Sequence, residues 1–116
     1  MDAAQYTIEN GGGTFRASDH TPVNPTSGFA VGITDGTATK FSLVGAGNAT
    51  YLQSRIAEVT YRYPNAPYIG TWIDDEKVCH IDPVVILSNP DDAVAVGRAM
   101  GQLAIYDFET GKAIDL

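Results

Sequence analysis

The densest group of chemically active side chains is a run of carboxylates in the second half of the chain. Asp74, Asp75 and Glu76 are consecutive, and Asp82 follows six residues after Glu76. Carboxylates at close spacing can hold a divalent cation, but this run lacks the glycine and the terminal glutamate of a calcium loop. The spacing is typical of a solvated turn between two strands. We therefore expect no metal at this run.

The other reactive side chains are scattered along the chain. Cys79 is the only cysteine, which excludes an intrachain disulfide and a four-cysteine zinc site, so we expect a buried hydrophobic residue. His20 and His80 lack a second ligand at helical or hairpin spacing, and neither predicts a zinc site. The sequence contains no nucleophile elbow, metalloprotease, phosphate-loop or dinucleotide fingerprint. These patterns indicate no catalytic residue and no cofactor.

Charge is distributed unevenly along the 116 residues, whose net charge is −7. Residues 1–67 hold five acids and four bases, whereas residues 68–116 hold nine acids and three bases. Phosphate backbones are bound by basic stripes, so this second half argues against direct contact with nucleic acid. No apolar run approaches the roughly 20 residues of a membrane-spanning helix, and the first residues lack the pattern of a secretory signal. We therefore expect a cytoplasmic protein that enters no membrane.

Two helices are predicted to position these side chains. The first follows from an apolar stripe spaced by four, three and four residues: Leu52, Ile56, Val59 and Tyr63. It is expected over about residues 49–62, because Pro64 ends it. The second is expected over about 90–101, where Pro90 suits the first helical position and Gly101 ends the helix.

The first third of the chain is predicted to contain a short strand, a loop and a hairpin. The strand covers Tyr6–Ile8, and residues 10–27, rich in glycine, proline and small polar residues, are expected to form a flexible surface loop. Strand periodicity then returns, and the Asp-Gly pair at 35–36 predicts a turn. A three-residue loop there makes Val31 face Phe41 across the hairpin.

A second hairpin is predicted around residues 75–76. In a two-residue register Trp72 pairs with Cys79, which places Trp72 on the core face. After the second helix, Leu103–Phe108 is expected to form a strand, and a turn then leads to a last short extended segment.

These elements favour an α+β fold. Helices separated by hairpins, rather than alternating strictly with single strands, argue against a doubly wound parallel sheet. We predict a single domain over residues 1–116, an antiparallel sheet of four to six strands with two helices packed on one face. The second helix is expected to bury Val94 and Gly97 with Met100 or Ala93.

Several segments of residues 68–116 form a pattern that is typical of one group of proteins. They are Tyr68-Ile69-Gly70-Thr71-Trp72-Ile73-Asp74, Asp82, Pro90-Asp91-Asp92-Ala93, Gly97-Arg98, Gln102-Leu103-Ala104-Ile105-Tyr106-Asp107 and Gly111-Lys112. This pattern resembles small uncharacterised proteins of bacteriophages and bacterial mobile elements. The resemblance implies an accessory protein in a bacterial host cell, of the kind that counters host defence or modulates host complexes. It implies no catalytic role for any residue.

Our principal hypothesis is a non-enzymatic acidic module that binds a host or phage-encoded protein. It would inhibit a host defence complex, as anti-CRISPR proteins do, by occupying a basic surface. The expected contact residues are acids that we predict to be exposed, most of them in one continuous patch: Asp74, Asp75, Glu76, Asp91, Asp92, Asp107 and Glu109. Tyr61 and Tyr63 cannot share a helical face, so one of them is a candidate for an exposed aromatic contact.

Two alternatives belong to other classes of function. The first is a small enzyme whose site is formed by residues that converge only in space: Asp74, His80, Arg98 and Asp107. The second is a self-associating module, a homodimer in which the strand at 103–108 or the exposed face of 68–74 pairs with a second copy.

Overall fold

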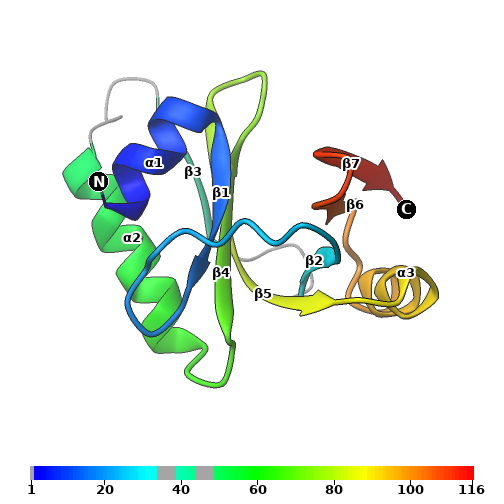
Figure 1. Ribbon diagram of the computed structural model, residues 1–116. Helices are drawn as coiled ribbons and strands as arrows, with labels where there is room; N and C mark the ends of the chain where they lie inside the picture. The colour runs from blue at the N-terminus through cyan, green and yellow to red at the C-terminus, as the bar shows by residue number, and fades with distance from the viewer. Residues whose placement is uncertain (1, 34–38, 44–48) are drawn as a thin grey trace.

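The computed structural model describes residues 2–33, 39–43 and 49–116. In these residues three helices accompany a seven-stranded antiparallel sheet that stays open, so the predicted α+β class is confirmed (Figure 1). The elements in chain order are α1 (Ala3–Asn10), β1 (Gly12–Arg16), β2 (Phe29–Gly32), β3 (Thr39–Ser42), α2 (Ala49–Arg62), β4 (Tyr68–Ile73), β5 (Val78–Leu87), α3 (Pro90–Ala99), β6 (Ala104–Asp107) and β7 (Lys112–Asp115). The sheet order is β1-β4-β5-β2-β6-β7, and β3 also pairs with β5.

The ten-residue strand β5 lies at the centre of the sheet and pairs with β2, β3 and β4. β4 pairs along one edge, whereas β3 and β2 lie end to end along the other edge. Because both short strands are antiparallel to β5, they run in the same direction and do not form the predicted hairpin. Val31 lies opposite Val85 and Phe41 opposite Cys79, so the predicted pair of Val31 with Phe41 is wrong. The predicted turn at 35–36 lies outside the described residues.

The N-terminal segment is more regular than predicted. The strand expected at Tyr6–Ile8 is part of α1, which Asp2 caps by accepting a hydrogen bond from the Gln5 N–H. Gly11 ends this helix in the left-handed conformation, with φ of 79°. The loop predicted over 10–27 contains β1, an edge strand whose Phe15 is fully buried. The assignment of all of 10–27 to a surface loop is therefore wrong.

The larger core lies between the sheet and the helices α1 and α2. The predicted stripe of α2 is confirmed, because Leu52, Ile56 and Val59 are fully buried. They pack with residues of α1 and of three neighbouring strands: Ala3, Ala4, Phe15, Ile69, Cys79 and Ile81. Figure 1 shows α1 and α2 together on one side of β1 and β4.

A second core forms around α3, where β5 ends (Figure 1). Ala93 and Gly97 are buried as predicted, Val94 is half-buried, and Met100 is exposed, so the Met100 alternative is wrong. A Cβ at Gly97 would lie 2.6 Å from Leu116 Cδ1, which shows how closely α3 approaches the C-terminal segment. The two clusters share no residue, so packing of α2 and α3 on one face is not confirmed.

The β4–β5 hairpin differs from the prediction by one residue. Its tip, residues 74–77, closes with hydrogen bonds from the Lys77 N–H to the Asp74 carbonyl and from the Asp74 N–H to the Val78 carbonyl. Lys77 has a φ of 65°, and this left-handed residue extends the loop to three residues. Trp72 therefore pairs with His80 instead of Cys79 and leaves the core face.

Candidate functional site

A row of side chains crosses the sheet on the side away from α1 and α2. Paired positions on four strands define this cross-strand row: Gly12 of β1, Trp72 of β4, His80 of β5 and Lys40 of β3. Successive strand residues point to opposite faces, and their neighbours Thr71 and Cys79 are buried on the helix side. The row therefore lies on the face away from the helices, where Trp72 is 47% accessible to solvent and Lys40 is exposed, while His80 is half-buried.

The indole of Trp72 is stacked against a neighbouring ring of the same sheet face. The His80 ring stacks on it, with the ring centroids 4.2 Å apart and the planes 9° from parallel. Its neighbour on the other side is Gly12, which contributes no side chain. A Cβ at Gly12 would lie 2.7 Å from the Thr71 carbonyl oxygen, so the backbone approach itself requires glycine there. One side of the indole is thus stacked on an imidazole, while the position paired with Trp72 on the other side carries no side chain.

Asp74 fixes both the hairpin tip and His80. Its Oδ1 accepts hydrogen bonds from the N–H groups of Glu76 and Val78, at 2.9 and 3.0 Å. Its Oδ2 lies 2.9 Å from His80 Nε2. These hydrogen bonds, with the one from His80 foremost, lower the pKa of Asp74 below its ordinary value. The ionised Asp74 is therefore a positioning residue for the turn and for the stacked imidazole.

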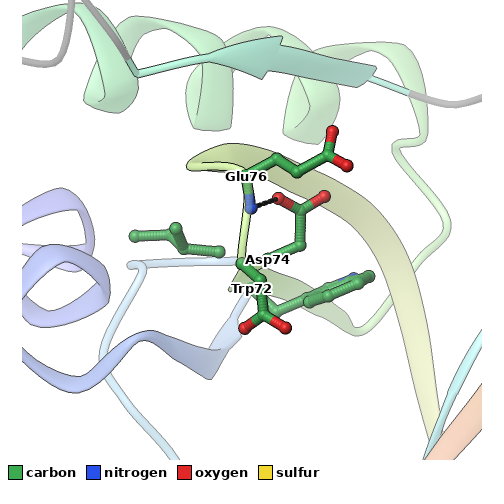
Figure 2. Close-up of a pocket in the computed structure, with 5 residues that line it drawn as sticks. Trp72, Asp74 and Glu76 are labelled. Atoms are coloured by element: carbon green, nitrogen blue, oxygen red, sulfur yellow. Dashed lines mark hydrogen bonds between the residues drawn. The ribbon is translucent and has the colours of Figure 1, made fainter.

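An open hollow of about 430 Å³ adjoins these residues. It is lined by Trp72, Ile73, Asp74, Asp75 and Glu76 (Figure 2). Figure 2 shows Trp72 and Asp74 projecting to the same side of the chain, with Glu76 beyond them. We name Trp72, Asp75 and Glu76 the tip site: Trp72 provides a flat apolar surface, and the other two provide exposed carboxylates.

The seven predicted contact acids fall into two sets at opposite ends of β5. Asp74, Asp75 and Glu76 precede its first residue, whereas Asp91 and Asp92 follow its last residue. Asp107 and Glu109 belong to the second end, because Asp107 pairs with Phe29, which also pairs with Leu87 of β5. A ten-residue strand is about 33 Å long. The predicted single patch is therefore two separate acidic ends.

Five of these seven acids are exposed as predicted. Asp74 and Asp107 are half-buried instead, because their side chains accept backbone hydrogen bonds within turns. Of the two tyrosines, Tyr61 is 89% exposed on the outer side of α2 and Tyr63 is half-buried. The predicted exposure of one tyrosine is confirmed, and its role as a contact stays a prediction.

The residues of the enzyme alternative do not converge. Asp74 and His80 are in contact, but Arg98 lies on α3 and Asp107 on β6, at the other end of β5. Among the described residues, no group of three or more histidine, cysteine, aspartate or glutamate side chains is placed to hold a metal ion. In the same part of the chain, no helix has the length and apolar character needed to cross a membrane.

Both strands named in the self-association alternative already have partners within the chain. β6 pairs with β7 along its length and with β2 at Tyr106 and Asp107, and β4 pairs with β1 and β5. Large exposed side chains remain in both segments: Trp72 on β4, and Leu103 and Tyr106 in the segment at 103–108. Formation of a homodimer stays a prediction.

Sequence reasoning missed Trp72 as the centre of the site. A signal was present in β4, where one face carries Ile69, Thr71 and Ile73 and the other carries Gly70 beside Trp72. A glycine in a strand marks a face that packs poorly, so the β-branched face was the better candidate for the core.

In comparisons with known proteins, no protein-family model matches the chain, and neither the curated proteins nor the solved structures contain a match. The resemblance to phage and mobile-element proteins thus stays a prediction, and function is argued from the geometry of the site.

Proposed function

We propose that this protein is a non-enzymatic binding module that docks on a basic surface of a partner protein through the tip site. The single observation that carries this proposal is the exposed indole of Trp72, stacked on His80 beside the carboxylates of Asp75 and Glu76. Tryptophan is among the residues most enriched at the energetic centres of protein interfaces.

The support of Trp72 by His80 suits it to binding. Immobilising a mobile side chain at an interface costs about 0.5–1.5 kcal/mol, and that cost opposes association. Because the indole is already stacked on His80, much of this ordering exists before the partner arrives. His80 is itself held by Asp74, so the platform is fixed through two successive contacts.

Electrostatics supports a basic partner. Asp75 and Glu76 are exposed, and Lys77 is the one base within the tip. The net charge of −7 attracts a basic surface over long range, which raises the rate of encounter and makes it sensitive to salt. Complementary charge also fixes the orientation of the docked partner.

The identity of the partner follows from the resemblance alone and stays a prediction. Trp72 and Asp74 belong to the segment that resembles phage and mobile-element proteins, which implies a host defence complex as the target. A basic channel that normally holds nucleic acid would suit an acidic tip with an aromatic platform, because carboxylates there take the place of phosphate charge.

Reversal of the two free carboxylates tests this proposal. A partner is captured from a bacterial lysate, identified and purified, and its Kd is measured for the wild type and for D75K/E76K. Asp74 is left unchanged because it holds the turn. The matched control is E109K/D115K, which changes the charge equally at exposed positions of the other end.

We expect D75K/E76K to weaken binding by about ten-fold or more and the control to change it by less than about three-fold. Wild-type affinity should also fall as salt is raised from 50 to 300 mM, because screening shortens the reach of the carboxylates. Equal losses in both variants, or a loss confined to the control, would show that the tip site is not the contact surface.

A further inference from the structure

We infer that the side of the Trp72 indole opposite His80 seats an arginine side chain of the partner. This inference rests on the proposed function and names the chemical group that the tip site recognises. It is carried by three features of the site: a stacked and exposed ring, a glycine at the position paired with it, and carboxylates beside the ring.

The ring is open to a second planar group. His80 occupies one side of the indole at 4.2 Å, which is the spacing of stacked rings. On the other side, the neighbouring position in the cross-strand row is Gly12, which carries no side chain to stack on the ring. Beyond β1, the Thr21 carbonyl and the Val23 N–H bond to Arg16 and Thr14. A partner side chain therefore reaches the indole from the exposed face of the sheet, where Trp72 is 47% accessible to solvent.

The charge around the ring selects a cation. Asp75 and Glu76 line the same hollow as Trp72 and are exposed. Carboxylates beside the ring repel phosphate groups and add nothing for a neutral aromatic ring. A cation gains from both surfaces, since the face of an indole is negative and tryptophan is the best aromatic partner for a cation.

Among the cationic side chains, the geometry favours arginine over lysine. A guanidinium is planar and stacks flat on an aromatic face, while its N–H groups remain free at the edge to donate to carboxylates. A lysine ammonium is compact and strongly hydrated, so it cannot cover the ring and pair with Asp75 in the same way. The site therefore distinguishes two side chains of equal charge.

The chain offers a direct probe, because Trp72 is its only tryptophan and its emission reports this site alone. Two blocked nonapeptides of alternating glycine and a basic residue, one with four arginines and one with four lysines, are titrated at 50 mM NaCl. We expect the arginine peptide to change the Trp72 emission and to bind at least about three-fold more tightly than the lysine peptide.

Calorimetry on three variants separates the inference from the proposed function. W72L should bind both peptides equally, D75K/E76K should bind both weakly, and Y106L, which removes an exposed aromatic at the other end, should keep the arginine preference. Equal wild-type affinities with unchanged emission, combined with a loss in D75K/E76K, would overturn the arginine site but leave the acidic contact. Binding that is indifferent to D75K/E76K would overturn both.

Discussion

A buried hydrogen bond between two threonine hydroxyls links α1 to β4, the strand that carries Trp72. Removing either hydroxyl should lower the free energy of unfolding, by amounts that depend on which of them donates. The Oγ1 atoms of Thr7 in α1 and Thr71 in β4 are 2.6 Å apart, and both residues are buried. Thr7 also donates to the Ala3 carbonyl at 2.8 Å, so Thr71 is the donor in the shared hydrogen bond. Valine has nearly the same shape as threonine, so T7V and T71V test the hydroxyl groups with little change in packing.

The direction of this hydrogen bond predicts unequal costs. T71V leaves the Thr7 hydroxyl with its donation to Ala3, so we expect a loss of about 0.5–1.5 kcal/mol in the free energy of unfolding. T7V leaves the Thr71 hydroxyl buried without its acceptor, which should cost about 1–3 kcal/mol. In T7V/T71V that unpaired hydroxyl is gone, so the double variant should cost less than the two single variants together.

Urea unfolding measures these three costs. Trp72 emission and circular dichroism follow the transition, and 1 kcal/mol moves the midpoint by about 0.3–1 M, given slopes of about 1–3 kcal/mol/M for small proteins. The expected result is a larger shift for T7V than for T71V, and a shift for the double variant that is smaller than the sum of the two. Equal costs for the single variants, or strict additivity in the double variant, would refute the assigned hydrogen-bond direction.

Three further variants or conditions test other parts of the structure. I56A should lower the free energy of unfolding by about 2–5 kcal/mol, because Ile56 is fully buried, whereas Y61A should change it by less than about 0.5 kcal/mol in the same urea assay. Cys79 is fully buried and burial raises its pKa to about 11, so at pH 8 its reaction with a thiol reagent should be at least about 100-fold slower in the folded protein than after unfolding. Hydrogen bonds lower the pKa of Asp74, so the ionised carboxylate contributes its full stability above its ordinary pKa of 3.8, and this contribution is lost as the pH falls through the lowered pKa. In unfolding curves between pH 2 and 6, D74N should remove this pH-dependent part of the stability.

Local signals predicted two of the three helices in the described residues. The stripe of α2, and the proline and glycine at the two ends of α3, act within a few residues of one another, and both helices are confirmed. The caps of α1, Asp2 and Gly11, were equally local. They went unused because an eight-residue segment offers too few apolar positions to separate helical from strand periodicity.

Pairing between distant segments could not be predicted in the same way. The Asp-Gly pair at 35–36 suggested that Val31 and Phe41 face each other, yet both strands found partners in β5, more than 35 residues further along the chain. At the hairpin tip, the left-handed conformation of Lys77 added one loop residue. Because strand side chains alternate, that one residue moved Trp72 from the predicted core to the exposed face.

The acidic residues show the same division between local and distant information. Their positions at turns and at a helix start predicted exposure, and five of seven are exposed. Their spatial grouping depends on the length of β5, which separates Asp75 from Asp91 by the full strand. Sequence reasoning therefore found most of the tip site's charge but missed its aromatic centre.

Labelling the single tryptophan with 5-fluorotryptophan tests the central claim most directly. The protein then gives one ¹⁹F resonance from Trp72, whose shift between H₂O and D₂O reports the exposure of the indole. On addition of the purified partner, we predict that this resonance moves and that its solvent shift falls well below the value for the free protein, in which Trp72 is 47% exposed. A resonance that keeps both its position and its solvent shift while the partner is fully bound would contradict the proposed contact through Trp72.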